Sequence, residues 1–240
     1  MIMKPQTIVL TGDIHGDIDR IENYCMDHGL TEQDLIVILG DAGLNYYGYT
    51  KDKGKKAIAN SLGPTILCIQ GNHEMDPDTL LYYKETAWNG GAVYVEEEFP
   101  NLLFAKNGEI YEFGGKTWAA IGGAYSVDKW YRLAYNMGWW KEEQLTEEEK
   151  QYVEANLSKH GWKVDHVLSH TVPKHYVPTE EFLDGIDQSR VDDSMELWLD
   201  TIEKRLEYEA WYAGHFHCQK IIDRLEILYE NYRVIEGESR

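Results

Sequence analysis

Three short apolar runs alternate with amphipathic segments in the first third of the chain. The runs TIVLTG, LIVILG and TILCIQG are rich in branched aliphatic residues and each ends at glycine, which is typical of buried strands. Between them, segments 18–28 and 52–61 have the spacing of helices. Strands that alternate with helices predict a βαβαβ unit built on a parallel sheet.

The pattern changes after Gly90. From Gly90 to Gly123, short apolar segments are separated by Gly, Pro and Asn without a helical period, which predicts an antiparallel meander or a second sheet. Thr146, followed by three glutamates, predicts a capping box for a helix that runs to about His160 and stops at Gly161. We further expect strands over 164–169 and 209–213, a helix over 191–206, and a hairpin or pair of strands over 219–234.

The composition fits one soluble domain. No linker, repeat or low-complexity block interrupts the 240 residues, and 43% are apolar, so we expect a single α/β domain over residues 1–240. Cys25, Cys68 and Cys218 are too widely spaced to indicate a disulfide framework and fit a reducing cytosol; Cys68, inside ILCIQ, is expected in the core. The N-terminal residues lack a signal-peptide pattern, and no apolar run approaches the ~18 residues of a membrane span. We expect a cytoplasmic protein that does not contact membranes.

The charge is strongly negative. Lysine and arginine number 23 against 42 acidic residues, which gives a net charge of −19 and a pI near 4.8. This balance disfavours a broad electrostatic contact with long nucleic acid. It leaves room for a small phosphorylated substrate, because bound metal ions can supply the positive charge that the side chains lack.

Polar side chains stand where five apolar runs end. Such strand ends lie at one edge of an open α/β sheet, where ligands bind. The oxygen and nitrogen donors found there form a set suited to two transition-metal ions. The fragments GDIHGD, GDAG, GNHE, SH and GHFH supply Asp13, His15, Asp41, Asn72, His73, His170, His215 and His217.

Each fragment taken alone also has a structural interpretation. Asp13 could belong to a tight turn, Asp41 could cap a helix, and a lone His170 would more often be structural. Gly12 and Gly16 permit the sharp bend that Asp13 and His15 need in order to converge. The five fragments agree in order, placement and residue type, and together they predict a metal site.

In this order, the fragments match the motif series of the calcineurin-like metallophosphoesterase superfamily over residues 12–217. The resemblance implies an α/β fold, a four-layer α/β/β/α sandwich with mixed sheets. It implies that Asp41 bridges two divalent ions. Mn²⁺ is the first candidate for these ions, and Fe, Zn or Ni are the alternatives. One ion would be held by Asp13, His15, Asp41 and His217, and the other by Asp41, Asn72, His170 and His215.

The chemistry that follows is hydrolysis of a phosphoester. Two ions about 3.5 to 4 Å apart can lower the pKa of a shared water, and a bridging hydroxide can then attack phosphorus in line. His73 lies next to a ligand but is not needed as a ligand itself, so we expect it to hydrogen-bond the phosphate or to protonate the leaving oxygen. The expected enzyme is a phosphatase or phosphodiesterase acting on a small phosphorylated metabolite or nucleotide.

The sequence departs from the eukaryotic-type Ser/Thr phosphatases, which continue the second motif as GDYVDRG. Here GDAGLNY places Leu44 and Asn45 where that subgroup has an acid and an arginine. The resemblance is therefore to bacterial or phage members. Arg132 is the candidate for a substitute phosphate clamp, and a surface arginine paired with an acid is the alternative.

Aromatic residues crowd two segments near the motifs. Those after Asp41 and those between 130 and 140 could stack a nucleobase, or could seal a loop or form the interface of a homo-oligomer.

Two other classes of function stay open. A nuclease or nucleic-acid end-processing enzyme would use a basic run that we expect instead to be a solvated helix face: Lys51, Lys53, Lys55 and Lys56. A non-catalytic binding protein that retained the fold is the remaining class.

Overall fold

The computed structural model describes residues 3–182 and 187–237, and within them two mixed sheets pack face to face. The first sheet is parallel at its centre, as predicted, and antiparallel at both edges, where β13 pairs with β1 and β4 with β5. Its described strands, in spatial order, are β13 (Tyr232–Glu236), β1 (Thr7–Thr11), β2 (Leu35–Ile38), β3 (Thr65–Cys68), β6 (Leu102–Ala105), β5 (Gly91–Glu96) and β4 (Tyr83–Trp88).

In the second sheet the neighbouring strands β8, β9, β10 and β12 are parallel, and the edge strands β7 and β11 are antiparallel to their neighbours. The predicted meander is thus divided, because β5 and β6 belong to the first sheet and β7 and β8 to the second. The described strands of the second sheet, in spatial order, are β11 (Lys220–Ile222), β12 (Leu225–Ile227), β10 (Ala210–Ala213), β9 (His166–Ser169), β8 (Lys116–Ile121) and β7 (Ile110–Phe113).

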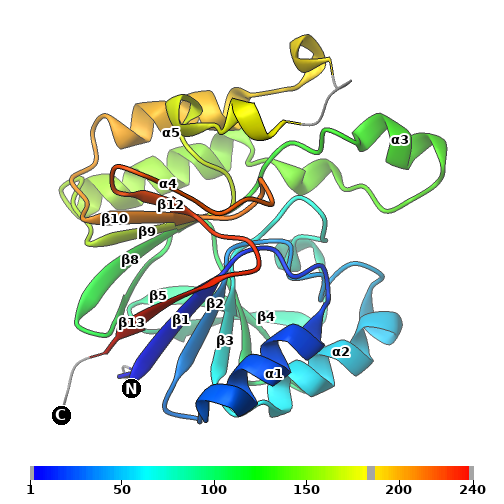
Figure 1. Cartoon of the computed structure of the whole chain (residues 1–240), viewed down its shortest axis with the longest axis vertical. Coiled ribbons are helices and arrows are strands. Elements are labelled where there is room, and N and C mark those ends of the chain that lie inside the picture. The colour runs from blue at the N-terminus through cyan, green and yellow to red at the C-terminus, as the bar shows by residue number, and fades with distance from the viewer. Residues whose placement is uncertain (1–2, 183–186, 238–240) are drawn as a thin grey trace.

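Helices cover the outer faces of both sheets and complete the predicted four layers (Figure 1). Helices α1 (Ile18–His28) and α2 (Tyr49–Ser61) lie on the first sheet, and α4 (Glu147–Lys159) and α5 (Ser194–Glu203) on the second. The predicted capping box of α4 is present. Within the described ranges, no helix is long and apolar enough to cross a membrane. Short 3₁₀ turns occupy Pro77–Thr79, Lys141–Glu143, Lys174–Tyr176, Thr179–Glu181 and Gln188–Arg190.

Strand alternation divides the core into layers. On β1, Ile8 and Leu10 face the second sheet and meet Trp118, while Val9 faces outward and packs in the same cluster as Ile21 of α1. A third cluster joins the second sheet to α4 and α5. The first sheet is therefore apolar on both faces, and polar groups are left to the ends of its strands.

Two elements were not predicted. Strand β4 pairs with β5 through a tight turn in which Asn89 and Gly90 have φ of 46° and 90°. Helix α3 (Lys129–Ala134) lies in the aromatic segment and projects from the body of the fold (Figure 1). Helix α2 also begins earlier than expected, at Tyr49, because the Asp52 carboxylate accepts the backbone N–H groups of Tyr47 and Gly48 at 2.8 and 2.9 Å.

The lysine run forms the predicted solvated face only in part, because Lys51, Lys53 and Lys55 are exposed and Lys56 is buried. Lys56 is only 1% exposed and pairs with buried Glu96. Lys53 pairs with Glu98 at 2.5 Å, and the Lys51 ammonium lies over the ring of Tyr47. The run therefore presents no continuous basic stripe for nucleic acid.

Asp76→Asn is expected to stabilise the protein at pH 8 by roughly 2 kcal/mol. Burial raises the pKa of Asp76 to about 6, from 3.8, so the folded state binds a proton more tightly than the unfolded state. The ionised carboxylate therefore costs stability, fully above about pH 6 and not at all below about pH 4. Asparagine can keep the cap at the N–H of Asp78, which Asp76 accepts at 2.9 Å.

Urea denaturation between pH 4 and pH 8 checks this expectation. The exposed Asp27→Asn variant serves as a control, whose difference from the wild type should not grow with pH. A gain from Asp76→Asn that is equal at both ends of the range would contradict burial as the cause.

Candidate metal centre

The first motif brings a carboxylate and an imidazole together after β1. His15 adopts a φ of 45°, and a Cβ at Gly12 would lie 2.0 Å from the carbonyl oxygen of Leu228, so only glycine fits there. His217 approaches from the other sheet, with Nε2 at 3.2 Å from Oδ2 of Asp13 and 3.0 Å from Nε2 of His15. The predicted bend and the predicted convergence of these residues are both present.

Asp41 lies at the centre of the cluster and is 2% exposed. Its Oδ1 accepts the backbone N–H of His73 at 2.7 Å and lies 3.7 Å from Nε2 of His170. Its Oδ2 lies 3.9 Å from Nε2 of His15. A Cβ at Gly71 would lie 2.0 Å from Oδ1, so this glycine is what allows the carboxylate into the centre.

The donors around Asn72 show that this site fits a cation. His170 is fully buried and its Nδ1 lies 2.8 Å from the carbonyl oxygen of Leu39, which can only accept, so the Nδ1 carries the proton. Nε2 of the same ring then faces Oδ1 of Asn72 at 2.7 Å, while Nδ2 of Asn72 donates to Ser126 at 2.9 Å. An imidazole nitrogen and an amide oxygen that meet at one point suit a transition-metal ion, and a backbone carbonyl behind the histidine is the usual support for a metal ligand.

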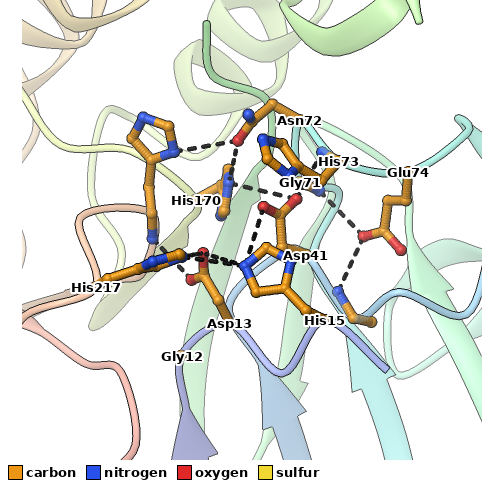
Figure 2. A network of polar contacts seen from close by, with 12 residues as sticks. Gly12, Asp13, His15, Asp41, Gly71, Asn72, His73, Glu74, His170 and His217 are labelled. Carbon is orange, nitrogen blue, oxygen red and sulfur yellow. Dashed lines mark hydrogen bonds and ion pairs between the residues drawn. The ribbon is translucent and has the colours of Figure 1, made fainter. Parts of the chain in front are cut away.

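Figure 2 shows these side chains pointing toward one another above the strand ends. In the described residues, three overlapping sets have ligand atoms that all lie within 4.8 Å of one another. One set includes His73, which the sequence analysis kept separate from the ligands. The three sets are Asp13 with His15 and His217, His15 with Asp41 and His73, and Asp13 with Asp41 and His170.

His215 completes the group around Asn72. Its backbone N–H donates to Oδ1 of Asp13 at 2.8 Å, and its Nδ1 lies 3.1 Å from Oδ1 of Asn72. All seven residues predicted as ligands are thus brought together at the ends of strands from both sheets.

Burial and close neighbours shift the pKa values at this site. Burial alone would raise the pKa of Asp13, but the hydrogen bond from His217 and nearby imidazoles outweigh it and hold that pKa below its usual range. The same hydrogen bond raises the pKa of His217. Burial holds the pKa of His215 well below its ordinary value and also lowers that of His73. The shifts of His215 and His73 favour neutral imidazoles, the form that binds metal.

Glu74 is a supporting residue that the sequence analysis did not select. Burial and the charge of Asp41 raise its pKa to about 8. Its Oε1 lies 3.2 Å from the backbone nitrogen of Gly71 and 3.4 Å from that of Ala42, and so joins the GDAG and GNHE loops. Its place inside GNHE, directly after His73, was the signal available.

The two residues that stand in place of the acid and the arginine of GDYVDRG lie in the core. Leu44 and Asn45 are fully buried, and Oδ1 of Asn45 accepts the hydroxyl of Tyr83 at 3.0 Å. Arg132 instead approaches His73, with Nη2 at 2.6 Å from Nδ1. It is 7% exposed, so it is not the surface arginine of the alternative interpretation, and its role toward phosphate stays a prediction.

Asp128 is the second residue that the sequence analysis missed. Its Oδ2 accepts Nε of Arg132 at 2.7 Å and its Oδ1 lies 3.7 Å from Nε2 of His73. The four-residue spacing of Asp128 and Arg132 on a helix was the signal. Several aromatic rings of the same segment stay exposed and do not seal it onto the core: Trp130, Tyr131 and Tyr135.

Comparisons with known proteins show the fold and the family of this chain. Two solved structures align over nearly the whole chain. TT1561 of Thermus thermophilus is 12% identical with a TM-score of 0.51, and the alignment covers 97% of this chain and 99% of that structure. A second structure is 13% identical with a TM-score of 0.52, and the alignment covers 97% of this chain and 95% of that structure. The TM-scores and coverage show a shared fold, and at these identities they show the fold alone. No curated protein matches. The family described as calcineurin-like phosphoesterase matches residues 6–219, and the chain therefore belongs to that family.

Proposed function

We propose that this chain hydrolyses phosphate esters of small phosphorylated metabolites or nucleotides at a centre of two divalent metal ions. Membership of the calcineurin-like phosphoesterase family supports metal-dependent phosphoester hydrolysis. The observation that carries the proposal is the approach of His170 Nε2 to Asn72 Oδ1 at 2.7 Å beside the carboxylate of Asp41, because these nitrogen and oxygen donors together suit a transition-metal ion.

The ligands divide into two groups that share Asp41. Asp13, His15 and His217 surround one position, and Asn72, His170 and His215 surround the other. The mixed oxygen and nitrogen donors suit Mn²⁺ first, with Fe, Zn or Ni as the other candidates. The two carboxylates bring about −2 against about +4 from two ions, so the centre attracts a phosphate although the chain carries a net charge of −19.

Two ions bound here would lower the pKa of a water molecule and neutralise the charge that develops on the phosphate. The protein's own residues do the rest. Asp41 keeps the backbone of His73 in place through the 2.7 Å hydrogen bond, and His73 would then hydrogen-bond a phosphate bound at the two ions. The water oxygen then forms a bond to phosphorus, and the bond from phosphorus to the leaving oxygen breaks.

A nuclease is the less favoured alternative. Binding along a nucleic-acid backbone requires several lysine or arginine contacts to phosphates. Here Lys53 is paired with an acid and Lys56 is buried, so neither of these two lysines is available for a contact with a phosphate.

Hydrolysis is expected to disappear with a chelator and to return when Mn²⁺ is added back. The screen should cover phosphomonoesters, phosphodiesters and dinucleoside polyphosphates, with elemental analysis of the purified protein alongside. His170→Asn should lose activity and bound metal together, because its Nε2 is a ligand atom. His175→Asn is the matched control, since His175 pairs with Asp200 outside the centre.

Failure of every substrate with every candidate metal, in protein that binds two ions, would count against an enzyme. It would favour a binding protein that retained the fold.

A further inference from the structure

Helix α3, which projects from the body of the fold, reaches the candidate metal centre through Arg132 (Figure 1). Nη2 of Arg132 lies 2.6 Å from Nδ1 of His73. The ring of His73 in turn has a nitrogen within 4.8 Å of ligand atoms of His15 and Asp41. A substrate whose phosphate is bound at this centre therefore has α3 as a neighbour on the side of His73.

Polar contacts hold the segment that carries α3, and its exposed rings are not needed to hold it. Nε of Arg132 donates to Oδ2 of Asp128 at 2.7 Å, and Nη1 donates to the carbonyl oxygen of Gly138 at 2.9 Å. Further along the segment, Oε2 of the buried Glu143 accepts the backbone N–H of Ser126 at 3.2 Å. The exposed rings of α3 are therefore available to contact a ligand.

Tyr131 and Tyr135 form a pair on one face of α3. They are four residues apart, and their ring centroids lie 4.6 Å from one another. The two residues are 58% and 68% exposed. Tyr135 lies three residues after Arg132, so the pair borders the face from which Arg132 reaches His73. Trp130 lies two residues before Arg132, which places it on the opposite side of the helix.

The loop after Asp41 brings a further aromatic ring to the same guanidinium. The hydroxyl of Tyr46 accepts a hydrogen bond from Nη1 of Arg132 at 3.4 Å, and the edge of this ring packs against Tyr47 with centroids 4.7 Å apart. Tyr47 is 60% exposed. Exposed aromatic rings from two distant segments are thus gathered around Arg132, and they suit a flat group bound next to the metal centre.

We propose that Tyr131 and Tyr135 stack the base of a nucleotide, and that nucleotides are therefore preferred to phosphorylated sugars as substrates. This inference rests on the proposed hydrolysis. A nucleotide combines a phosphate, which the ions bind, with a flat base, which the rings bind. Stacking requires no positive side chain, so it is compatible with the net charge of −19 that disfavours long nucleic acid. Every base has a π face, so no strong preference among the bases is expected.

A matched pair of substrates tests the preference in the metal-loaded enzyme. Adenosine 5′-phosphate and ribose 5-phosphate contain the same ester and differ in the base, and their methyl phosphodiesters replace them if the enzyme acts only on diesters. We expect kcat/KM for the nucleotide to be about 5-fold to 100-fold higher, mainly through a lower KM, which is the range for stacking of one base. Equal values for the two substrates would overturn the inference.

Variants of the exposed rings assign the preference to residues. Replacing both Tyr131→Ala and Tyr135→Ala should lower the ratio of the two kcat/KM values to near 1, whereas Tyr131→Phe with Tyr135→Phe keeps the rings and should keep the ratio. Trp130→Ala is the matched control, because it removes another exposed ring from the opposite side of the same helix. A ratio that survives the loss of both tyrosine rings, or that falls equally in Trp130→Ala, would contradict the role of the pair.

A binding measurement separates this inference from the proposed function. Adenosine contains no phosphate ester, so its binding does not depend on hydrolysis. In saturation-transfer difference NMR of the protein loaded with Zn²⁺, a diamagnetic ion, we expect transfer to the adenine protons in the wild type and its loss in the double alanine variant. Absence of transfer in a wild type that hydrolyses esters would overturn the inference alone. Transfer to adenosine in a protein that hydrolyses no ester would instead reject the proposed function.

A second copy of the chain is the alternative occupant of these rings. Sedimentation of the wild type and of the double alanine variant distinguishes the two, and we expect the same oligomeric state for both. A wild-type oligomer that dissociates in the double alanine variant would assign the rings to an interface and overturn the inference.

Discussion

Asp41→Asn is expected to lower kcat/KM by about 10³-fold, because neutralising the charge of a transferring phosphate by metal ions contributes several kcal/mol. The residue lies between the two groups of ligands, and both of its oxygens face imidazole nitrogens, at 3.7 and 3.9 Å. Asparagine keeps one oxygen for the N–H of His73 and tolerates the φ of 48°. The fold should therefore survive while the shared charged ligand is lost.

Kinetics and elemental analysis of the same preparations check this result. The expected metal content falls below that of the wild type, and the thermal midpoint without metal stays close to it. Asp34→Asn is the matched control, because Asp34 is also buried but caps Thr31 at the opposite end of β2. An Asp41→Asn enzyme that keeps most of its activity and its full metal content would remove Asp41 from its central role.

Glu96→Gln is expected to destabilise the fold by about 3–5 kcal/mol. The Lys56 ammonium is 1% exposed and Glu96 is 3% exposed, and burial lowers the pKa of Lys56 against the opposing effect of Glu96. The hydroxyl of Tyr83 lies 3.0 Å from the ammonium and is its remaining neutral partner. Removing the carboxylate takes away the acid that is hydrogen-bonded to this buried ammonium and leaves Asp52 and the rings of Tyr82 and Tyr83 as weaker compensation, which costs more than the loss of an exposed pair.

Urea denaturation of metal-free protein measures the effect. Glu97→Gln is the control on the neighbouring residue, because Glu97 forms an exposed pair with Lys84, and no measurable change is expected. The double variant Lys56→Met with Glu96→Leu should recover most of the loss, since it removes both charges. A single Glu96→Gln variant as stable as the wild type would show that Lys56 finds another partner.

The strands and helices with a clear period were predictable from the sequence. The central parallel strands and α1 and α4 were expected close to where they lie, because their apolar spacing and caps are local signals. Strand β4 was missed because four of its six residues are exposed and show no alternation, although the Asn89–Gly90 turn before β5 was a usable hairpin signal. The division of the meander between two sheets depends on long-range pairing, which no local pattern encodes.

The convergence of the seven candidate ligands could be predicted from the sequence, whereas the contacts around them could not. Its residues follow strand ends, so the topology of parallel strands brings them together regardless of loop detail. The partners of His73 come from α3, whose six residues are too few to show a period, and Arg132 was selected without Asp128. Lys56 was misjudged because a charged residue inside a basic run shows nothing of the acid that pairs with it from a distant strand.

Strands β1 and β13 lie far apart in the sequence, and they pair from Thr7 opposite Glu236 to Thr11 opposite Tyr232. During synthesis, β1 emerges long before β13, and one edge of β1 has no hydrogen-bonding neighbour until β13 leaves the ribosome. Pairings of such sequence separation form slowly. The protein is therefore expected to fold late and to need protection of an open edge from aggregation until β13 arrives.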